Sequence, residues 1–210
     1  MVKSIILNNY LSALSARRLL YISEKGALNL RDVCSTEMKY SSYSKTLSTV
    51  SYKQFDTRWK SLFTSCGGTM GQQGCAITSC SMIFNVQPDV HLSEMKAHDG
   101  ADCPYQWSTG ASLKNKIYSA TTGSFNSLKA AMFENIITNE LPMVVAVPDH
   151  FIVVQEFVGT LPMDPGGGPI YSSITSDMFT VNDPGSSYNF TLQDVINQKG
   201  PVSRIGVFKQ

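Results

Sequence analysis

The sequence predicts an α+β fold in which a helix-rich half precedes a half built on an antiparallel sheet. In the first half, apolar residues recur at three- and four-residue spacing behind a glycine-rich turn, as in a helix with one buried face: Ile77, Cys80, Ile83 and Phe84. In the second half, two apolar runs are typical of buried strands, MVVAV at 143–147 and FIVVQEF at 151–157. A short turn separates these runs, so we expect them to be adjacent strands of the sheet.

The first 50 residues differ in character from the rest of the chain. Residues 1–33 show a loose amphipathic helical pattern, and residues 34–51 are rich in Ser, Thr, Tyr and Lys, as in a linker or an extended surface segment. We therefore expect an accessory segment over 1–50 and the main domain over 51–210. The accessory segment is interpreted as a pro-segment, a tail that docks to a partner, or a helix packed on the back of the domain. On this boundary, a chain starting near Thr49 should fold and stay active.

The remaining elements follow in chain order. Residues 86–122 are punctuated by Gly and Pro, and we expect loops and short helices there, including a helix over 110–118. Residues 127–139 have the spacing of an amphipathic helix with Leu128, Met132 and Ile136 on its inner face. A glycine- and proline-rich hairpin loop, LPMDPGGGP, links the second strand to the third. The other expected elements are a strand over 178–181, a short helix over 191–198 and a closing strand over 205–208.

Composition narrows the classes of function. The 210 residues are 42% hydrophobic, which is enough for one full core. Lys and Arg number 17 against 16 Asp and Glu without a charged block, so neither nucleic-acid binding nor electrostatic membrane docking is indicated. No apolar run approaches the roughly 20 residues that span a bilayer, and the N-terminus lacks the shape of a signal peptide. Localisation stays open between the cytoplasm, a virion and export by a non-classical route.

The cysteines also restrict the chemistry. They are odd in number and include no CxxC pair: Cys34, Cys66, Cys75, Cys80 and Cys103. The odd count argues against a complete disulfide framework, and the spacing argues against a structural zinc site. We therefore expect no metal or other cofactor and at least one free thiol. Cys80, five residues after Cys75, should point away from it into the core.

Cys75 is the candidate nucleophile because of its position in the chain. It follows the Gly-rich turn and falls in the first turn of the predicted helix. Unpaired backbone N–H groups and the positive end of the helix dipole favour a thiolate there. The alternative interpretation is a small buried apolar residue, which is the commoner role of a cysteine at the start of a core helix.

Two further residues complete a possible catalytic set. His150 begins a predicted buried strand and Asp183 ends the next one, so adjacent antiparallel strands would bring the two side chains together. Thiol catalysis needs a base for the sulfur proton and a group that orients that base. Taken singly, His150 reads as an ordinary strand-end histidine and Asp183 as a turn former. His91 and His98 lie in the irregular segment without a motif and are expected to face solvent.

Four segments in order resemble papain-fold cysteine peptidases of the bacteriocin-processing (double-glycine peptidase) type, in a form without a transporter. They are YKQFDTRW, GQQGCAITSCSMI, LPMVVAVPDHFIVVQEF and FTVNDPG, between residues 52 and 185. The resemblance implies a papain-like fold with Cys75 as nucleophile, His150 as general base and Asp183 as the orienting carboxylate. It also implies that the Gln54 side chain and the Cys75 N–H hold the oxyanion, although Gln54 alone would read as a surface residue. The chain departs from the pattern at Ile77, and its first 50 residues have no counterpart.

The substrate follows less directly than the chemistry. The resemblance implies a peptidase acting on a protein or on cell-wall peptide cross-links, with deamidation or transglutaminase-like transfer as a further option. No transporter segment is present, so processing of an exported leader peptide is disfavoured. Two alternatives from other classes are a catalytically silent papain-like binding module and a particle-associated structural protein.

Overall fold

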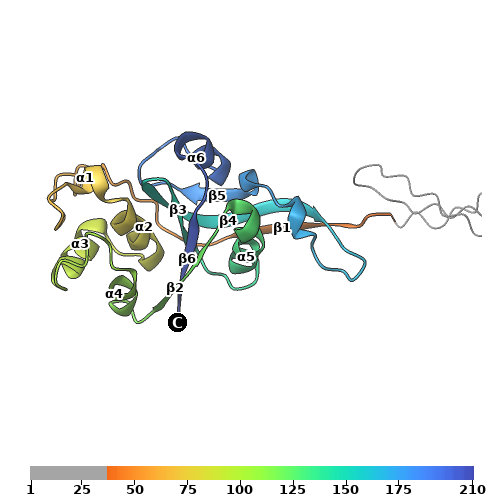
Figure 1. Cartoon of the computed structure of the whole chain (residues 1–210), viewed down its shortest axis with the longest axis horizontal. Helices are drawn as coiled ribbons and strands as arrows, with labels where there is room; N and C mark the ends of the chain where they lie inside the picture. Colours follow the sequence, from red (N-terminus) through yellow and green to blue (C-terminus); the bar gives the residue numbers. More distant parts are fainter. Residues whose placement is uncertain (1–36) are drawn as a thin grey trace, which may run out of the picture. The chain divides into compact units, whose positions relative to one another are not determined.

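A computed structural model describes residues 37–210, and Tyr40–Gln210 is called the sheet unit. Its architecture is α+β, with a six-stranded sheet whose pairings are all antiparallel (Figure 1). The strands are β1 (Tyr40–Thr46), β2 (Ile117–Thr122), β3 (Met143–Val147), β4 (His150–Pro162), β5 (Phe179–Asn182) and β6 (Arg204–Lys209). The helices are α1 (Met70–Gln73), α2 (Cys75–Phe84), α3 (Pro88–Lys96), α4 (Trp107–Ser112), α5 (Phe125–Ile137) and α6 (Leu192–Lys199), with two 3-10 turns at Tyr171–Ser173 and Ser176–Met178.

The long strand β4 organises the sheet. Its first half pairs with β3 and its second half with β1. Because β1 and β5 both pair with Glu156 and Phe157, they must occupy opposite edges of β4. On the far side of β3, β6 and then β2 complete the sheet. The pairing of β4 with β5 therefore sets the start of β4 beside the end of β5, where the candidate residues lie.

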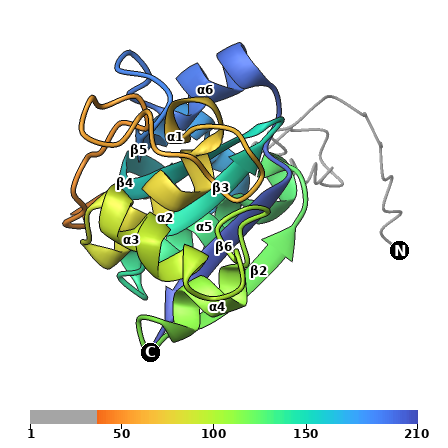
Figure 2. The same ribbon diagram turned by 90° about the vertical axis from the view of Figure 1, so that its left-hand side faces the viewer.

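Helices cover both faces of the sheet, and the alternation along β3 shows why. Val144 packs with Cys80 and Ala111 from α2 and α4, whereas Val145 belongs to the main core with Met132 of α5. Successive side chains of a strand point to opposite faces, so a run that is apolar at every position must be covered twice. The five residues of β3 are all buried, as this arrangement requires. Figure 2 shows α2 crossing in front of the sheet.

The helix-rich half, α1 to α4, lies at one end of the sheet and has a small core of its own (Figure 1). Its centre is Trp59, which is fully buried and packs with Met70, Ile77 and Leu92. The Trp59 indole N–H donates to the Lys53 carbonyl at 2.7 Å, so its polar edge is satisfied. This cluster holds the segment before α1 against the start of α2.

Most of the predicted elements are confirmed. The apolar-periodic helix is α2, and the amphipathic helix is α5, which buries Leu128, Met132, Phe133 and Ile136. The two apolar runs form β3 and β4, although β4 extends five residues further, to Pro162. The third strand, the last helix and the closing strand correspond to β5, α6 and β6. The LPMDPGGGP loop folds as a hairpin closed by a bridge between Met163 and Pro169.

The helix expected over 110–118 is wrong in its second half. Helix α4 ends at Ser112, and residues from Ile117 form β2, which pairs with β6 in the register Ile117↔Lys209. The sequence IYSATT is rich in β-branched and aromatic residues, which suit a strand. Its partner strand is far along the chain, so this pairing has no local signature.

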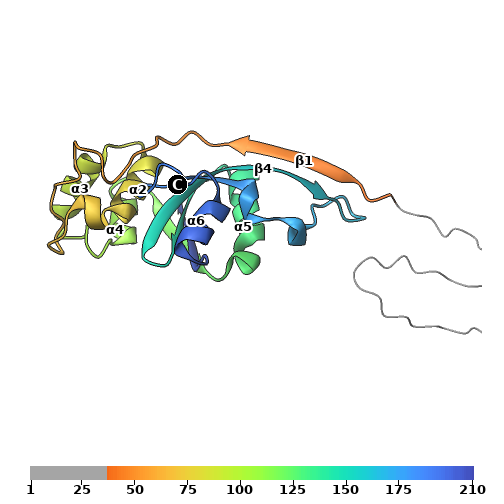
Figure 3. The ribbon, with the colours of Figure 1, turned by 90° about the horizontal axis from the view of Figure 1, so that it is seen from above.

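The Ser- and Tyr-rich segment before residue 51 contributes to the sheet. Tyr40–Thr46 is extended, as one of the two interpretations held, and pairs along β4 as strand β1 (Figure 3). Tyr43 packs edge-on against Phe133 of α5 with ring centroids 5.0 Å apart. The sheet unit therefore begins at Tyr40, upstream of the boundary expected at residue 51. The helical pattern and accessory role predicted for 1–33 lie outside the described residues.

Deleting β1 should destabilise the sheet unit. A chain starting at Thr49 loses the β1–β4 pairing and the Tyr43 contact, whose apolar burial and aromatic pairing together are worth about 2 kcal/mol or more. We expect its melting temperature to fall by about 5 °C or more relative to a chain starting at Glu37. The measurement is thermal unfolding of both chains by circular dichroism. Equal melting temperatures would show that β1 is dispensable.

Candidate active site

The site is built where the first turn of α2 approaches the start of β4. Cys75 is the first residue of α2 and is partly exposed. The preceding Gly74 closes a tight turn, since a Cβ at that position would lie 2.4 Å from the Met70 carbonyl oxygen. Only glycine fits such an approach, which explains the glycine directly before the cysteine. The N–H groups of the first helical turn lack partners within the helix and face the same side.

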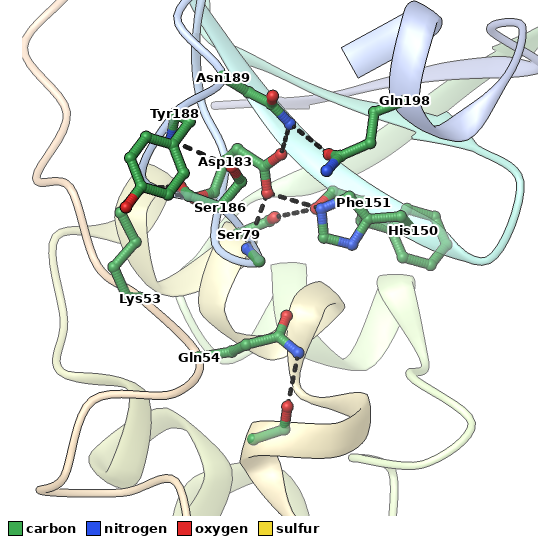
Figure 4. Close-up of polar contacts among 12 residues, drawn as sticks. Lys53, Gln54, Ser79, His150, Phe151, Asp183, Ser186, Tyr188, Asn189 and Gln198 are labelled. Carbon is green, nitrogen blue, oxygen red and sulfur yellow. Dashed lines mark hydrogen bonds and ion pairs between the residues drawn. The ribbon is translucent and has the colours of Figure 1, made fainter. Parts of the chain in front are cut away.

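The sheet brings His150 and Asp183 together as predicted. His150 opens β4, and Asp183 follows β5 directly. Because Val153 is paired with Asn182 in the antiparallel register, the start of β4 lies beside the end of β5. His150 Nε2 is 2.7 Å from Asp183 Oδ1, and the Asp183 side chain is fully buried (Figure 4).

Three donors surround the Asp183 carboxylate. Oδ1 accepts hydrogen bonds from His150 Nε2 and the Gly185 N–H, both at 2.7 Å, and Oδ2 accepts one from Asn189 Nδ2 at 2.7 Å. Burial alone would raise the pKa of this carboxyl, but the hydrogen bonds and the charge of His150 outweigh burial and lower it. Asp183 is therefore ionised at neutral pH.

His150 has Asp183 on one side and Cys75 near it. Burial alone would lower the pKa of its imidazole, but the hydrogen bond to Asp183 and the nearby Cys75 side chain raise that pKa to about 9. Because Nε2 is engaged by Asp183, Nδ1 is the ring nitrogen available to the Cys75 sulfur. The structure thus joins His150 to Asp183 by a hydrogen bond and sets the Cys75 side chain near enough to the imidazole to raise its pKa, so the imidazole holds a proton at neutral pH.

Gln54 lies beside these three residues without bonding to them. Its side-chain Nε2 donates to the Gly71 carbonyl of α1 at 2.9 Å, and its backbone N–H donates to the Pro184 carbonyl at 2.9 Å (Figure 4). The opposite assignment of the amide would set two acceptors face to face at Gly71, so the NH₂ group must face the carbonyl. One amide hydrogen is left for another acceptor, and the role in an oxyanion hole stays a prediction.

Sequence reasoning missed two residues that shape the site. Lys53 Nζ donates to the carbonyl oxygens of Asp183 and Ser186, each at 2.6 Å, and so holds the turn that carries the carboxylate. Gly185 leaves room for the imidazole, because a Cβ there would lie 2.8 Å from His150 Cε1. The Asp-Pro-Gly turn signalled the glycine, whereas nothing near Lys53 in the sequence signals a partner so far along the chain.

A cavity of about 280 Å³ is lined in part by Cys75. It is walled mainly by aromatic and apolar groups, namely Ala76, Pro104, Tyr105, Trp107 and Phe151, together with Gln73, Asp102 and Cys103. The Cys66–Cys103 disulfide ties this wall to the loop before α1. Buried Asp102 reinforces that link by accepting hydrogen bonds from the backbone and hydroxyl of Ser65.

The remaining cysteines and His98 differ in pairing and exposure. Among the described cysteines, Cys75 and Cys80 are free and Cys80 is fully buried, as expected. The Cys66–Cys103 pairing was not anticipated, and Cys34 lies outside the described residues. His98 is exposed, as expected.

The prediction that His91 faces solvent is wrong. Its side chain is fully buried, and Nε2 lies 2.8 Å from the Tyr105 hydroxyl in the cavity wall. Burial lowers the pKa of His91 to about 4, so the ring is neutral and can share a hydrogen bond with the phenol. Histidine is polar, so an exposed position was expected. In the structure Tyr105, on a later loop, supplies the hydrogen bond that the buried ring needs.

Residues 37–210 contain neither a metal-type cluster of side chains nor a membrane-spanning helix. No three side chains of the metal-ligating types are grouped there as they would be around an ion. Nor does this part of the chain contain a helix with the length and apolar character needed to cross a bilayer.

Comparisons with known proteins add little. No protein-family model matches the chain, and no curated protein matches it either. Among solved structures, the chain is similar to UfSP from C. elegans, with a TM-score of 0.42 and 11% identity over 89% of this chain and 41% of that one. The chain thus spans about two fifths of that protein's length. A TM-score of this size is too low to carry an assignment, so the site rests on its own geometry.

Replacing His150 should slow alkylation of Cys75. Without the imidazole to accept its proton, Cys75 should react like an ordinary cysteine, of which only about 1% is thiolate at pH 6.5. We expect iodoacetamide to modify Cys75 about a hundredfold more slowly in His150→Ala, measured by mass spectrometry of peptides over time. The matched control is His98→Ala, which changes an exposed histidine away from the contact. Equal rates in the folded His150 variant would rule out the coupling.

Proposed function

We propose that this chain is a cysteine peptidase with a papain-like site, in which Cys75, His150 and Asp183 act as a triad. The observation that carries the proposal is the buried 2.7 Å hydrogen bond between His150 and Asp183. The Cys75 side chain, at the start of α2, is near enough to the imidazole to help raise its pKa. An ordinary structural histidine has no need of a buried carboxylate on one nitrogen and a free thiol at the other. Perturbed ionisation beside a cavity is typical of functional sites.

The reaction follows from these groups. The Cys75 sulfur, its proton held by His150, adds to the carbonyl carbon of a peptide bond, and the carbonyl electron pair moves onto oxygen. The Gln54 amide and the Cys75 N–H donate to that oxygen. When the intermediate collapses, the C–N bond breaks, the amine leaves with the proton from His150, and an acyl group remains on sulfur. Water, activated by the same imidazole, then releases the acid and regenerates the thiol.

The proposed substrate is a peptide chain, from a protein or from a bacterial cell-wall cross-link. The cavity beside Cys75 is lined mainly by apolar and aromatic groups, which supports a substrate residue with an apolar side chain next to the scissile bond. A silent binding module would have no use for an ionised Asp183 that holds a proton on His150. Both substrate types contain the amide that the sulfur would attack.

Hydrolysis should depend on Cys75. We expect the full chain to cleave unfolded casein or a D-alanine-containing cell-wall peptide, and Cys75→Ala to lower the rate at least about a thousandfold. The measurements are release of new N-termini and detection of the acyl-enzyme by mass spectrometry. Cys80→Ala, which removes the other free thiol of the described region, serves as the matched control and should retain activity. Absence of cleavage of both substrates, with no trapping of Cys75 by a peptidyl acyloxymethyl ketone, would refute the proposal.

Removing the Gln54 amide should reduce kcat and spare KM. Its donor would meet negative charge that exists only in the tetrahedral intermediate, so Gln54→Ala should lower kcat about a hundredfold. The variant also loses the bond to Gly71, worth about 1 kcal/mol, so thermal unfolding is measured alongside to show that the fold is retained. A change confined to KM would place Gln54 on the binding surface instead.

A further inference from the structure

The loop between β5 and α6 turns one side chain inward between two exposed aromatic residues. Tyr188 and Phe190 are 84% and 66% exposed, whereas Asn189 between them faces Asp183 (Figure 4). The loop backbone is pinned there, since the Val181 N–H donates to the Phe190 carbonyl at 2.9 Å. Asn189 therefore reaches Asp183 from a loop whose backbone is bonded to β5 at the next residue.

Asn189 uses both hydrogens of its amide. Nδ2 donates to Asp183 Oδ2 at 2.7 Å and to Gln198 Oε1 on α6 at 2.9 Å. An ionised carboxylate only accepts, so the amide must present its NH₂ group to Asp183. Within the described part of the chain, no other donor reaches Oδ2, while Oδ1 is occupied by His150 and Gly185.

We propose that Asn189 is a positioning residue of the triad, which holds the Asp183 carboxylate in the plane where Oδ1 meets His150, and that Gln198 in turn holds Asn189. The role rests on the proposed peptidase function for its purpose, but the geometry is independent of any substrate. Without Asn189, one oxygen of a fully buried carboxylate would lack a partner, which is costly for a charged group. The carboxylate would then rotate to find a donor or take up a proton, and either change weakens its hold on His150.

This role predicts a specific dependence on pH. The charged or titratable groups around Asp183 are His150 on β4, Cys75 beyond it on α2, and Lys53, whose Nζ donates to the Asp183 carbonyl. The contribution of the ionised carboxylate is present above its folded-state pKa and is lost as pH falls through that value. Removing a donor raises that pKa, so the loss begins at a higher pH.

The test compares two replacements of Asn189 in the full chain. Asn189→Leu keeps the size and removes the donor, and it should move the acidic limb of the Cys75 alkylation profile up by about one pH unit and lower kcat about tenfold, the effect of one charge-assisted hydrogen bond. Asn189→Asp sets two carboxyls within hydrogen-bond reach. At low pH the two carboxyls share a proton, so the introduced one can still donate to Asp183, whereas at higher pH both ionise and repel each other. The alkylation rate of Asn189→Asp, relative to that of the unmodified chain, should therefore be highest at acid pH. Asn189→Leu should show the opposite trend.

If Asn189 merely supported the fold, both replacements would lower the alkylation rate and kcat by the same factor at every pH. The matched control is Asn197→Leu, which replaces an exposed asparagine on α6 that has no hydrogen bond to Asp183, and its profile should match that of the unmodified chain. Should Asn189→Leu fail to fold, Gln198→Leu leaves Asn189 in place and should shift the acidic limb in the same direction by a smaller amount. Profiles of the Asn189 variants that superimpose on that of the unmodified chain would overturn the proposal.

The alkylation profile needs no substrate, so the two proposals can fail separately. If the unmodified chain cleaves no peptide but the acidic limb still moves in Asn189→Leu, the positioning role stands and the peptidase assignment falls. If the chain cleaves peptides and neither Asn189 variant changes its pH profile, the peptidase assignment stands and Asn189 has no positioning role.

Discussion

The hydrogen bond between His150 and Asp183 is the constraint on which the site depends. A fully buried carboxylate is tolerated only if it is paired and its oxygens find donors. This chain meets the requirement with donors from three places. They are the His150 imidazole on β4, the Gly185 N–H in the turn after β5 and the Asn189 amide in the loop before α6. The glycine at 185 has a second purpose, because any side chain there would occupy the space of the imidazole.

The same turn ties the site to the segment before α1. Lys53 holds the carbonyls of Asp183 and Ser186, and the Gln54 backbone N–H holds that of Pro184. Burial lowers the pKa of Lys53, while the nearby Asp183 charge opposes that effect. A segment in the helix-rich half is thus fastened to a turn in the sheet half, and the side chain of Gln54 is set between that turn and α1.

Packing between α2 and β4 sets where the thiol meets the imidazole. The Ser79 hydroxyl, one turn after Cys75, donates to the Phe151 carbonyl at 3.1 Å, directly beside His150. Across the neighbouring cavity, Tyr105 is supported from behind by buried His91, and the Cys66–Cys103 disulfide holds the loop that carries it. The buried His91 ring and the Tyr105 hydroxyl therefore satisfy each other, so neither polar group is left unpaired behind the largely apolar cavity wall.

The sequence by itself determined the elements whose cause is local. The apolar period of α2 and α5, the unbroken apolar run of β3 and the Asp-Pro-Gly turn each follow from neighbouring residues, and so does the place of Cys75 at a helix start. Tertiary structure alone decided that Ser- and Tyr-rich Tyr40–Thr46 is a strand, because its partner on β4 is more than a hundred residues away. Tertiary structure also decided that Asn189 is a hydrogen-bond partner of Asp183. The loop sequence does not show which of its polar side chains points inward, because that depends on the position of the buried carboxylate. Strand pairing and the hydrogen bonding of a buried charge both join residues that are far apart in the chain, so the local sequence pattern does not reveal them.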